Sequence, residues 1–245
     1  MEDKALLSTE VASGAEKAEL LIVIPAYNEA ENIERVVNHL TANFPQYDYV
    51  VVNDGSRDET AAICQRNGYN LLNLPVNLGL AGAFQAGLKY ADKYGYQYAV
   101  QLDGDGQHRP EYLESMIKKM EEGSDIVIGS RFVGEKKPFT MRMLGSNLIE
   151  MAIRFTTGVN IKDPTSGMRM FSKRMIREFA SGLNYGPEPD TVSYLIRQGA
   201  RVAEVPVIMD ERILGVSYLT PVNAMRYMLK MLISILLIQN FRKRR

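Results

Sequence analysis

The chain has 245 residues and is 46% hydrophobic, which allows one large α/β domain with a buried core and excludes disorder as its main state. Lys and Arg together number 29, as do Asp and Glu, so the balanced charge gives no reason to expect a nucleic-acid partner. The charges are unevenly placed, because no acidic residue follows Glu211 and the chain ends in Arg242, Lys243, Arg244 and Arg245. This end of the chain therefore favours an anionic partner.

The N-terminal segment and the single cysteine bear on the compartment. Residues 1–18 are polar and acidic and lack the basic start and apolar run of a secretory signal, so we expect a flexible segment there. Cys64 has no second cysteine for an intramolecular disulfide, and a reducing compartment is the simplest interpretation. We therefore expect the protein to stay in the compartment where it is made.

The first half of the chain alternates short β-branched apolar runs with stretches of helical periodicity. Strands are predicted at Leu20–Pro25, Tyr49–Asn53, Asn70–Leu74, Tyr98–Leu102 and Asp125–Gly129, and helices at Ala30–Asn43, Arg57–Asn67, Ala81–Lys93 and Pro110–Glu121. Such a βαβ series predicts a mostly parallel sheet covered by helices, with ligands beyond the carboxyl ends of its strands.

The second half alternates less regularly. Helices are expected at Met141–Thr157 and Glu188–Gln198, and strands at Gly167–Phe171 and Arg201–Met209. We see no repeat and no Gly/Ser-rich linker, so this half is expected to complete the same domain. It is also expected to supply the side of the site that binds a second substrate.

Two polar turns follow the first two predicted strands. After the first, Pro25, Tyr27 and Glu29 place a ring that can stack on a nucleobase beside a carboxylate that can accept from ribose hydroxyls. After the second, Asn53 and Asp54 offer acceptors for the N–H of a base. The alternative in both places is structural, because polar residues at these positions could simply cap the helix that follows.

The fourth predicted strand is followed by two carboxylates, Asp103 and Asp105, separated by a glycine. Like charges this close are costly unless a cation lies between them, and carboxylate oxygens suit Mg²⁺ or Mn²⁺ bridged to substrate phosphates. Gln107 could add a third oxygen, whereas His108 is expected to line the loop. A tight Asp-Gly hairpin is the alternative, but Pro110 and the helical stretch after it argue against a returning strand.

In chain order the sequence reads PAYNE, NDGSRDET, NLGLAGA, DGDGQHRP, GSRF and DPTSGMRMF. Together these motifs resemble the family 2 glycosyltransferases, particularly dolichyl-phosphate mannose synthases and bacterial enzymes that glycosylate polyprenyl phosphate. The resemblance covers about Leu20 to Tyr218. It implies a single GT-A domain over 19–219, which is a Rossmann-like α/β fold with a mostly parallel sheet, followed by a C-terminal amphipathic helix.

The resemblance also implies roles for individual residues. It assigns Pro25, Tyr27 and Glu29 to the nucleoside, Asp54 to the base, Asp103 to the nucleotide or metal, Asp105 and Gln107 to the metal, and Arg131 and Arg169 to phosphates. Two departures from the family pattern concern the base and the acceptor. Asn53 stands where relatives often have an acid, and Arg212, Gly215 and Ser217 match an acceptor-phosphate motif in which Tyr218 replaces a lysine.

The implied reaction is a single displacement that inverts the anomeric carbon. Arg131, together with the metal, would neutralise the departing nucleoside diphosphate. A hydroxyl acceptor would need a base, for which Asp190 is the candidate, with Glu188 beside it at the start of the same predicted helix. Both acids could instead only complement the helix dipole. A lipid phosphate, already anionic, would need no base.

Residues 220–245 predict an amphipathic helix with a basic tail. Its charge-free part, Met231–Phe241, has eleven residues, or roughly 16 Å of helix against a hydrocarbon core of about 30 Å, and is too short to span a bilayer. A helix lying in the interface of an anionic membrane fits this pattern. The alternatives are packing on its own domain, on a second copy of the chain, or on an integral membrane partner.

From the sequence we therefore expect a peripheral enzyme on the cytoplasmic face of the membrane. It would move a sugar from a nucleotide sugar, UDP-linked by preference, to polyprenyl (undecaprenyl) phosphate or a polyprenyl-linked glycan in cell-surface polysaccharide synthesis. A nucleotidyltransferase is one alternative, although Tyr27 and Glu29 stand where it would carry a Gly-rich basic loop. A non-catalytic nucleotide-sugar-binding adaptor is the other.

Overall fold

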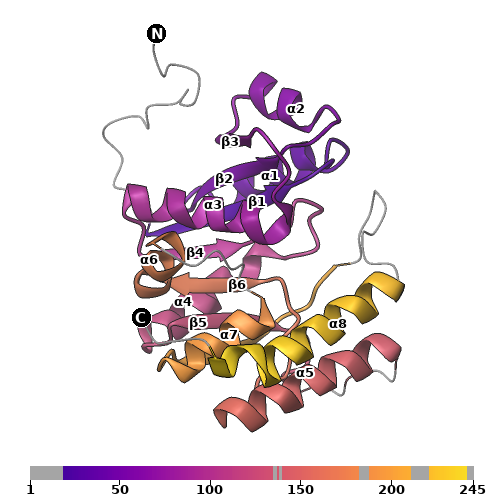
Figure 1. Cartoon of the computed structure of the whole chain (residues 1–245). Coiled ribbons are helices and arrows are strands. Elements are labelled where there is room, and N and C mark those ends of the chain that lie inside the picture. The colour runs from indigo at the N-terminus through magenta and orange to yellow at the C-terminus, as the bar shows by residue number, and fades with distance from the viewer. Residues whose placement is uncertain (1–18, 135–136, 138–139, 182–187, 211–220, 242–245) are drawn as a thin grey trace.

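The computed structural model describes residues 19–134, 137, 140–181, 188–210 and 221–241, which build one mixed sheet covered by helices (Figure 1). Within these residues the sheet has the strand order β3-β2-β1-β4-β6-β5-β7. The strands are β1 (Leu20–Ala26), β2 (Asp48–Asp54), β3 (Leu71–Leu74), β4 (Tyr98–Gln101), β5 (Ile126–Ser130), β6 (Arg169–Ser172) and β7 (Val202–Pro206). All neighbouring strands are parallel except β6, which runs antiparallel to both β4 and β5. The predicted α/β fold with a mostly parallel sheet is confirmed.

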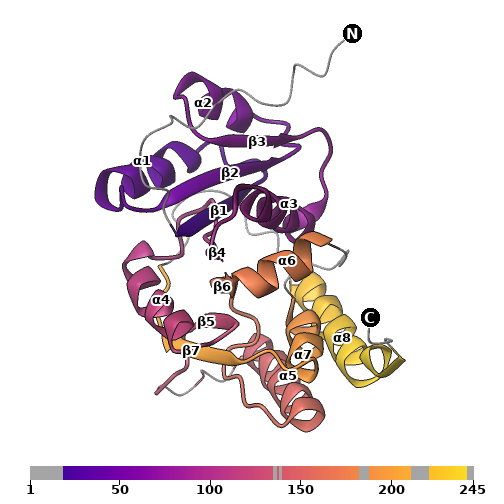
Figure 2. The ribbon, with the colours of Figure 1, turned by 90° about the vertical axis from the view of Figure 1, so that its left-hand side faces the viewer.

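Helices cover both faces of the sheet. They are α1 (Ile33–Asn43), α2 (Thr60–Arg66), α3 (Gly79–Tyr94), α4 (Leu113–Glu121), α5 (Met141–Thr157), α6 (Lys173–Ser181), α7 (Pro189–Arg197) and α8 (Pro221–Leu236), with 3-10 turns η1 (Pro110–Tyr112) and η2 (Ile238–Phe241). Figure 2 shows α1 and α4 on one side of the sheet and α3, α5, α6, α7 and α8 on the other. The two layers enclose separate hydrophobic cores, one against each face of the sheet.

The central strand β1 explains how the sheet is organised. Its sequence, LLIVIPA, is buried at every position, with alternate side chains in each of the two cores. An unbroken apolar run of this kind suits a parallel strand covered on both faces. Helix α3 approaches β1 closely at Gly87, where an added Cβ would overlap Cγ1 of Val23. Burial of β1 thus leaves polar groups only at its two ends.

Most predicted elements lie within a few residues of their observed bounds, and one shift at a helix start has a physical cause. The helix predicted from Ala30 begins only at Ile33. The preceding turn is held by the second strand's loop, because Glu29 N donates to Thr60 Oγ1 at 2.9 Å and Ala30 N to Asp58 Oδ2 at 3.1 Å. Helix α6 was not predicted.

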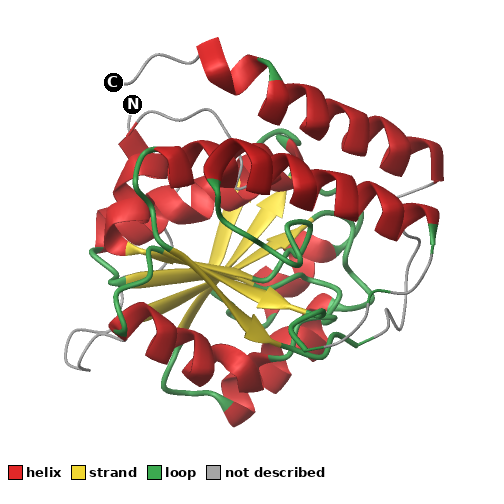
Figure 3. Cartoon of the chain, turned by 90° about the horizontal axis from the view of Figure 1, so that it is seen from below, coloured by secondary structure: helices red, strands yellow, loops and turns green. Residues whose placement is uncertain are grey.

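The C-terminal helix α8 packs along α5 and contacts α7. Seen from below in Figure 3, α5 and α8 are the two long helices that lie side by side, and the colour gradient of Figure 1 shows that they run in the same direction. Met228, Met231 and Ile235 of α8 belong to the core, and Gly145 of α5 permits this approach, because a Cβ there would lie 2.8 Å from Met228 Sδ. Among the described residues, no helix is long and apolar enough to cross a membrane.

Replacing Gly87 with Ala tests the close packing of α3 on β1. The extra methyl group should lower the free energy of unfolding by about 1–2 kcal/mol, because overpacking of this buried contact outweighs the better helix propensity of Ala. Urea unfolding measures the change. The matched control is Lys89→Ala on the exposed side of the same helix, which should change stability by less than about 0.5 kcal/mol. A Gly87→Ala variant as stable as the wild type would contradict the packing.

Candidate active site

The loop after β4 holds the first predicted metal ligand in a fixed orientation. Asp103 Oδ1 accepts from Gln101 Nε2 at 2.9 Å, and the Asp103 backbone N donates to His108 Nδ1 at 3.1 Å. The other ring nitrogen, His108 Nε2, lies 3.5 Å from Asp103 Oδ2. The imidazole is buried, so His108 lines the loop, as predicted, and orients Asp103.

The second carboxylate in this loop, Asp105, is buried and held by its neighbours. Its Oδ1 accepts from Gln107 N at 3.0 Å, and its carbonyl accepts from Arg35 Nη2 at 2.8 Å. Gly106, which lies between Asp105 and Gln107, has φ +80°, a left-handed conformation that glycine adopts without strain. The Gln107 amide donates through Nε2 to the carbonyl of Asp210 at 3.1 Å. The three predicted metal-binding residues thus lie in one hydrogen-bonded loop.

The donor set of this loop fits a hard divalent cation. Asp103, Asp105 and Gln107 offer carboxylate and amide oxygens, and the described residues contain no group of three acidic, His or Cys side chains that could enclose a metal alone. Mg²⁺ and Mn²⁺ commonly take one or two carboxylates from the protein and complete their shell with water and substrate phosphates. The loop therefore suits a metal that binds together with a diphosphate.

The turn after β1 lies directly against the metal loop. A Cβ on Gly104 would be 3.1 Å from the carbonyl of Pro25 and 3.5 Å from Cγ of Glu29, so the two loops are in close contact at this glycine. Tyr27 is 42% exposed, which leaves its ring face available for stacking. Asn28 has φ 55°, and its backbone N donates to Ser56 Oγ at 3.0 Å. The first and second turns are therefore joined into one surface.

Capping accounts for only part of the polar contacts in these two turns. The N-cap of α1 is Asn32 and that of α2 is Glu59, and neither makes a side-chain capping bond. Ser56 and Asp58 instead bond to the turn after β1, although Asp58 Oδ1 also accepts from Thr60 N at 3.0 Å in the first turn of α2. The side chains of Ser56 and Asp58 therefore hold the turn after β2 against the turn after β1.

The predicted base contacts Asn53 and Asp54 are both 2% exposed. Asn53 Nδ2 donates to Asn73 Oδ1 at 2.6 Å, and Asp54 Oδ1 accepts from Leu78 N at 2.7 Å, which fixes the chain just before α3. Contact of these two residues with a base stays a prediction.

The predicted phosphate-binding residue Arg131 forms a bidentate ion pair at the end of β5. Its Nε and Nη2 donate to the two carboxylate oxygens of the fully buried Asp163, at 2.7 and 2.8 Å. The fork geometry orients the guanidinium and leaves the N–H groups of Nη1 for a further anion. Sequence reasoning did not assign Asp163 a role, although it opens the DPTSGMRMF motif.

The other predicted phosphate-binding residue, Arg169, starts β6 beside the metal loop. The pairing of Val100 with Met170 places Arg169 next to Gln101, two residues before Asp103. A Cβ on Gly167 would lie 3.4 Å from Asp103 Oδ2, so the backbone before β6 contacts that carboxylate side. The antiparallel strand β6 therefore brings the two motifs together.

The Arg169 guanidinium is buried, and its Nε has no hydrogen-bond partner, while Nη2 donates to the Pro164 carbonyl at 2.7 Å. Burial lowers the pKa of this guanidinium, and the nearby Tyr227, Glu188, Asp163 and Asp190 partly offset that effect. Arginine stays protonated in proteins, so a buried N–H without an acceptor is costly. An anionic ligand would supply the missing acceptor.

The candidate base Asp190 lies in the first turn of α7. Its Oδ2 accepts from Ser234 Oγ of α8 at 2.6 Å and from Gln239 Nε2 at 3.4 Å, while Oδ1 accepts from Thr191 N at 2.9 Å. These contacts tie α7 to α8. A catalytic role for Asp190 stays a prediction, and the structure gives this carboxylate a structural role as well.

The neighbouring acid Glu188 is the N-cap residue of α7 and makes no side-chain capping bond. Burial raises the pKa of its carboxyl, Asp190 acts in the same direction, and Lys230 and Arg169 oppose the shift. Glu188 thus stays protonated to a higher pH than an exposed Glu. Arg212 and Ser217, the predicted acceptor-phosphate contacts, lie outside the described residues.

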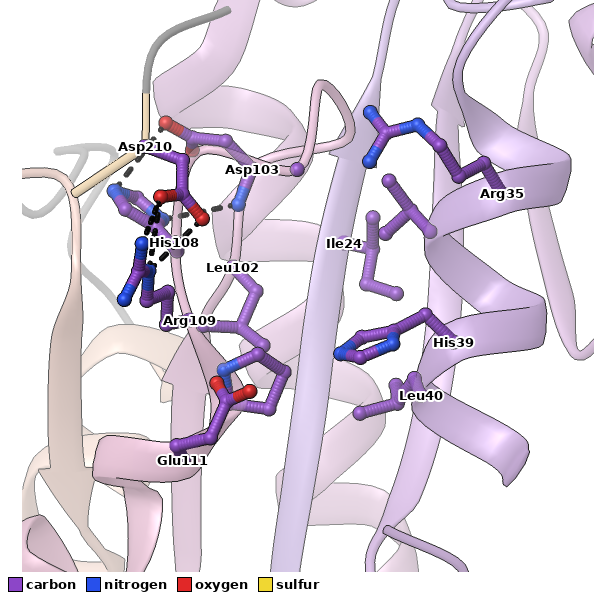
Figure 4. A pocket seen from close by; sticks show the side chains of 13 residues that line it. Ile24, Arg35, His39, Leu40, Leu102, Asp103, His108, Arg109, Glu111 and Asp210 are labelled. Carbon is purple, nitrogen blue, oxygen red and sulfur yellow. Dashed lines mark hydrogen bonds and ion pairs between the residues drawn. The ribbon is translucent and has the colours of Figure 1, made fainter. Parts of the chain in front are cut away.

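A cavity of about 400 Å³ lies behind the metal loop, on the α1 side of β1 (Figure 4). Ile24, Arg35, His39 and Asp103 are among the residues that line it. Arg169 and Asp190 are not among the residues that line it. Sequence reasoning missed Asp210, which borders this cavity and pairs with Arg109.

The family model for Glycosyl transferase family 2 matches residues 21–179, a segment that contains the β1 turn, the metal loop and both arginines. The chain belongs to glycosyl transferase family 2. The resemblance inferred from the motifs is thereby confirmed.

Two relatives extend the similarity beyond the segment matched by the glycosyl transferase family 2 model. The chain is 32% identical to a polyprenol monophosphomannose synthase from Mycolicibacterium smegmatis, over 86% of this chain and 84% of the relative. It is 30% identical to a UDP-N-acetylglucosamine–dolichyl-phosphate N-acetylglucosaminyltransferase from Methanococcus voltae, over 77% of this chain and 84% of the relative.

Among solved structures, glucosyl-3-phosphoglycerate synthase from Mycobacterium tuberculosis, in complex with Mn²⁺, UDP and glucosyl-3-phosphoglycerate, matches with a TM-score of 0.65. The match covers 90% of this chain and 79% of that chain at 19% sequence identity, which establishes the shared fold alone. The expected fold of this family 2 glycosyltransferase is confirmed.

Replacing Glu188 with Gln should stabilise this family 2 enzyme at pH 8. Because the folded-state pKa of Glu188 is raised, its ionisation costs stability as the pH rises through that value, and the cost is absent below the unfolded-state pKa of about 4.3. We expect a Tm about 1–3 °C above the wild type at pH 8 and no difference near pH 4, measured by thermal unfolding. Glu31→Gln, at an exposed position, is the control. A less stable Glu188→Gln variant at pH 8 would contradict the burial of this charge.

Proposed function

We propose that this chain transfers a sugar from a nucleotide sugar, UDP-linked by preference, to a polyprenyl phosphate such as undecaprenyl phosphate, or to a polyprenyl-linked glycan, in cell-surface polysaccharide synthesis. One observation carries the proposal. The paired carboxylates Asp103 and Asp105 share a sheet edge with Arg169, a buried cation with an unsatisfied N–H. Such an edge offers one place for a metal-bound diphosphate and another for a second phosphate.

The donor side follows from the loops around β1 and β4. Tyr27 and Glu29 would hold the nucleoside, and Asp103, Asp105 and Gln107 would hold Mg²⁺ or Mn²⁺. The metal would act as a Lewis acid on the leaving diphosphate. Arg131, oriented by Asp163, would place its outer N–H groups on the same phosphates, which stabilises the charge that develops as the glycosidic bond breaks.

The acceptor side favours a phosphate over a hydroxyl. A hydroxyl must lose a proton, and the candidate base Asp190 already accepts hydrogen bonds on both carboxylate oxygens. A lipid phosphate attacks as an anion, so it needs a cation to position it, and Arg169 supplies a buried one whose Nε–H has no acceptor within the described part of the chain. The attack comes from the face opposite the leaving group, which inverts the anomeric carbon.

Two named relatives support the class of acceptor, because one is a polyprenol monophosphomannose synthase and the other acts on dolichyl phosphate. They carry different sugars, so they do not decide the donor. UDP is preferred because the second relative uses UDP-N-acetylglucosamine.

A membrane-facing surface supports the lipid acceptor. On α5, Leu144, Leu148, Met151 and Phe155 are all more than 40% exposed and recur every three or four residues, so they form one apolar stripe. On α8, Met225, Leu229, Ile233 and Leu236 form a second exposed stripe. The two helices that carry these stripes pack against each other and run in the same direction (Figure 3). The sequence predicted an apolar surface on α8 alone, and the structure adds the exposed apolar residues of α5.

The same surface carries positive charge at its margin. Arg154 of α5 and Arg226 and Lys230 of α8 are exposed, and the sequence continues into the basic run at 242–245. A broad apolar face with basic neighbours suits the interface of a membrane with anionic lipids. We therefore propose a peripheral association, on the cytoplasmic face of the membrane that the sequence led us to expect. A second copy of the chain or an integral membrane protein would be the alternative occupant of this surface.

The reaction is tested with purified enzyme, polyprenyl phosphate, Mn²⁺ and a panel of UDP- and GDP-sugars. Radiolabelled sugar should enter the lipid fraction from one donor, and Asp105→Asn should lower kcat/KM at least a hundredfold because it weakens the charge that holds the metal. Asp92→Asn, at an exposed position on α3, is the control. Transfer only to a soluble sugar hydroxyl would reject the lipid-phosphate acceptor, and transfer of a nucleotidyl group would favour a nucleotidyltransferase. Binding of a nucleotide sugar without turnover would favour the adaptor.

The membrane surface is tested separately by co-sedimentation with vesicles of phosphatidylglycerol and phosphatidylcholine. Met151→Glu with Phe155→Glu should reduce the bound fraction at least fivefold, because each charge opposes burial of the stripe in lipid. The control is Val76→Glu with Leu80→Glu, which adds the same charge at exposed apolar positions outside both helices. Equal sedimentation of the two double variants would contradict the assignment of the surface. A dimer that dissociates in the α5 variant would identify a second copy as the occupant.

A further inference from the structure

Asp210, just beyond β7, is bonded to the metal loop although it is 101 residues from Arg109 in the chain. Its carboxylate accepts from Arg109 Nε on both oxygens at 2.9 Å, and Arg109 Nη2 also donates to Oδ1. Figure 4 shows this pair beside His108 and Asp103, at the rim of the cavity behind the loop. The pair joins two segments that no strand pairing connects.

The backbone of Asp210 adds a second connection, to Gln107. Asp210 N donates to the Gln107 carbonyl at 3.0 Å, and the Asp210 carbonyl accepts from Gln107 Nε2 at 3.1 Å. The first of these bonds fixes the main chain of the loop, and the second fixes its side-chain amide. The carboxamide is planar, and its nitrogen and oxygen are bonded to the same carbon. Holding Nε2 in one direction therefore also determines where Oε1 points.

We propose that Asp210 and Arg109 are positioning residues that orient Gln107 as a metal ligand. This inference rests on the metal site of the proposed function. Asp210 acts directly on Gln107, and Arg109 acts by holding Asp210. Gln107 in turn donates its backbone N to Asp105 Oδ1, so the same contacts determine where the second carboxylate lies. Outer residues that orient metal ligands in this way typically change metal affinity by 10- to 100-fold.

The alternative is that the ion pair contributes only to folding. Its side chains are 41% and 43% exposed, and exposed pairs of this kind contribute little to stability. A second bidentate pair, Arg174 with Asp125, lies at the other end of the strands, just before β5 begins. The two pairs differ in position relative to the metal loop, so Arg174 provides a matched control.

The test measures Mn²⁺ binding to the full chain by electron paramagnetic resonance, with UDP or GDP present. Arg109→Gln and Asp210→Asn should each raise the Kd for Mn²⁺ by about tenfold, with a Tm within about 2 °C of the wild type. Arg174→Gln should change the Kd by less than about twofold. An unchanged Kd in both site variants, or a loss of affinity that follows a loss of Tm equally in Arg174→Gln, would overturn the proposal.

A double-mutant cycle separates orientation of Gln107 from a general effect on the loop. In a Gln107→Ala background, Arg109→Gln should change the Kd much less than in the wild type, because the side-chain amide is absent and only the backbone contacts of residue 107 to Asp210 and Asp105 remain. A full tenfold effect in that background would overturn the proposed route through Gln107. The proposed function fails independently, because wild-type protein that binds Mn²⁺ normally but transfers no sugar to lipid would leave the role of Asp210 and Arg109 intact.

Discussion

The structure depends on one constraint, which is that β1 is apolar at every position and buried on both faces. A strand of this kind admits no charge along its length, so the chemistry collects in the loops where it and its neighbours end. The approach of Gly104 to Pro25 and of Gly167 to Asp103 shows how little space separates those loops. Glycines at these positions let the turn after β1, the metal loop and the start of β6 form one continuous surface.

Charge compensation organises that surface. Asp163 is fully buried and neutralises Arg131, whereas Arg169 is buried with one N–H unsatisfied and acids at longer range. A protein that needed only stability would complete this arrangement with an acceptor of its own. An incomplete set of hydrogen bonds around a buried cation is instead expected where an anionic substrate supplies the last acceptor.

The sequence was most informative where one short segment contains all the groups involved. The strand β1, the helix Met141–Thr157 and the Asp103–Gln107 loop could each be predicted because periodicity or spacing within a few residues determines them. The antiparallel direction of β6 could not, because the long segment between β5 and β6 gives no local sign of how the chain returns. The Arg109–Asp210 contact was also missed, because its partners are far apart in sequence and each one alone resembles an ordinary surface charge. For α5, the periodicity predicted a helix, but only its packing beside α8 shows which face stays exposed.

The common direction of α5 and α8 has a consequence for how a long substrate would be handled. Both helices begin at the end of the molecule toward which the parallel strands point, where Asp103 and Arg169 lie (Figure 1). If the exposed stripes rested on a bilayer as proposed, the helix axes would lie in the plane of the headgroups, with Asp103 and Arg169 at one margin of the membrane contact. An isoprenoid could then present its phosphate at that edge while its hydrocarbon stays dissolved in the membrane. The enzyme would then recognise the phosphate of the acceptor, and the length of the isoprenoid chain would have little effect on recognition.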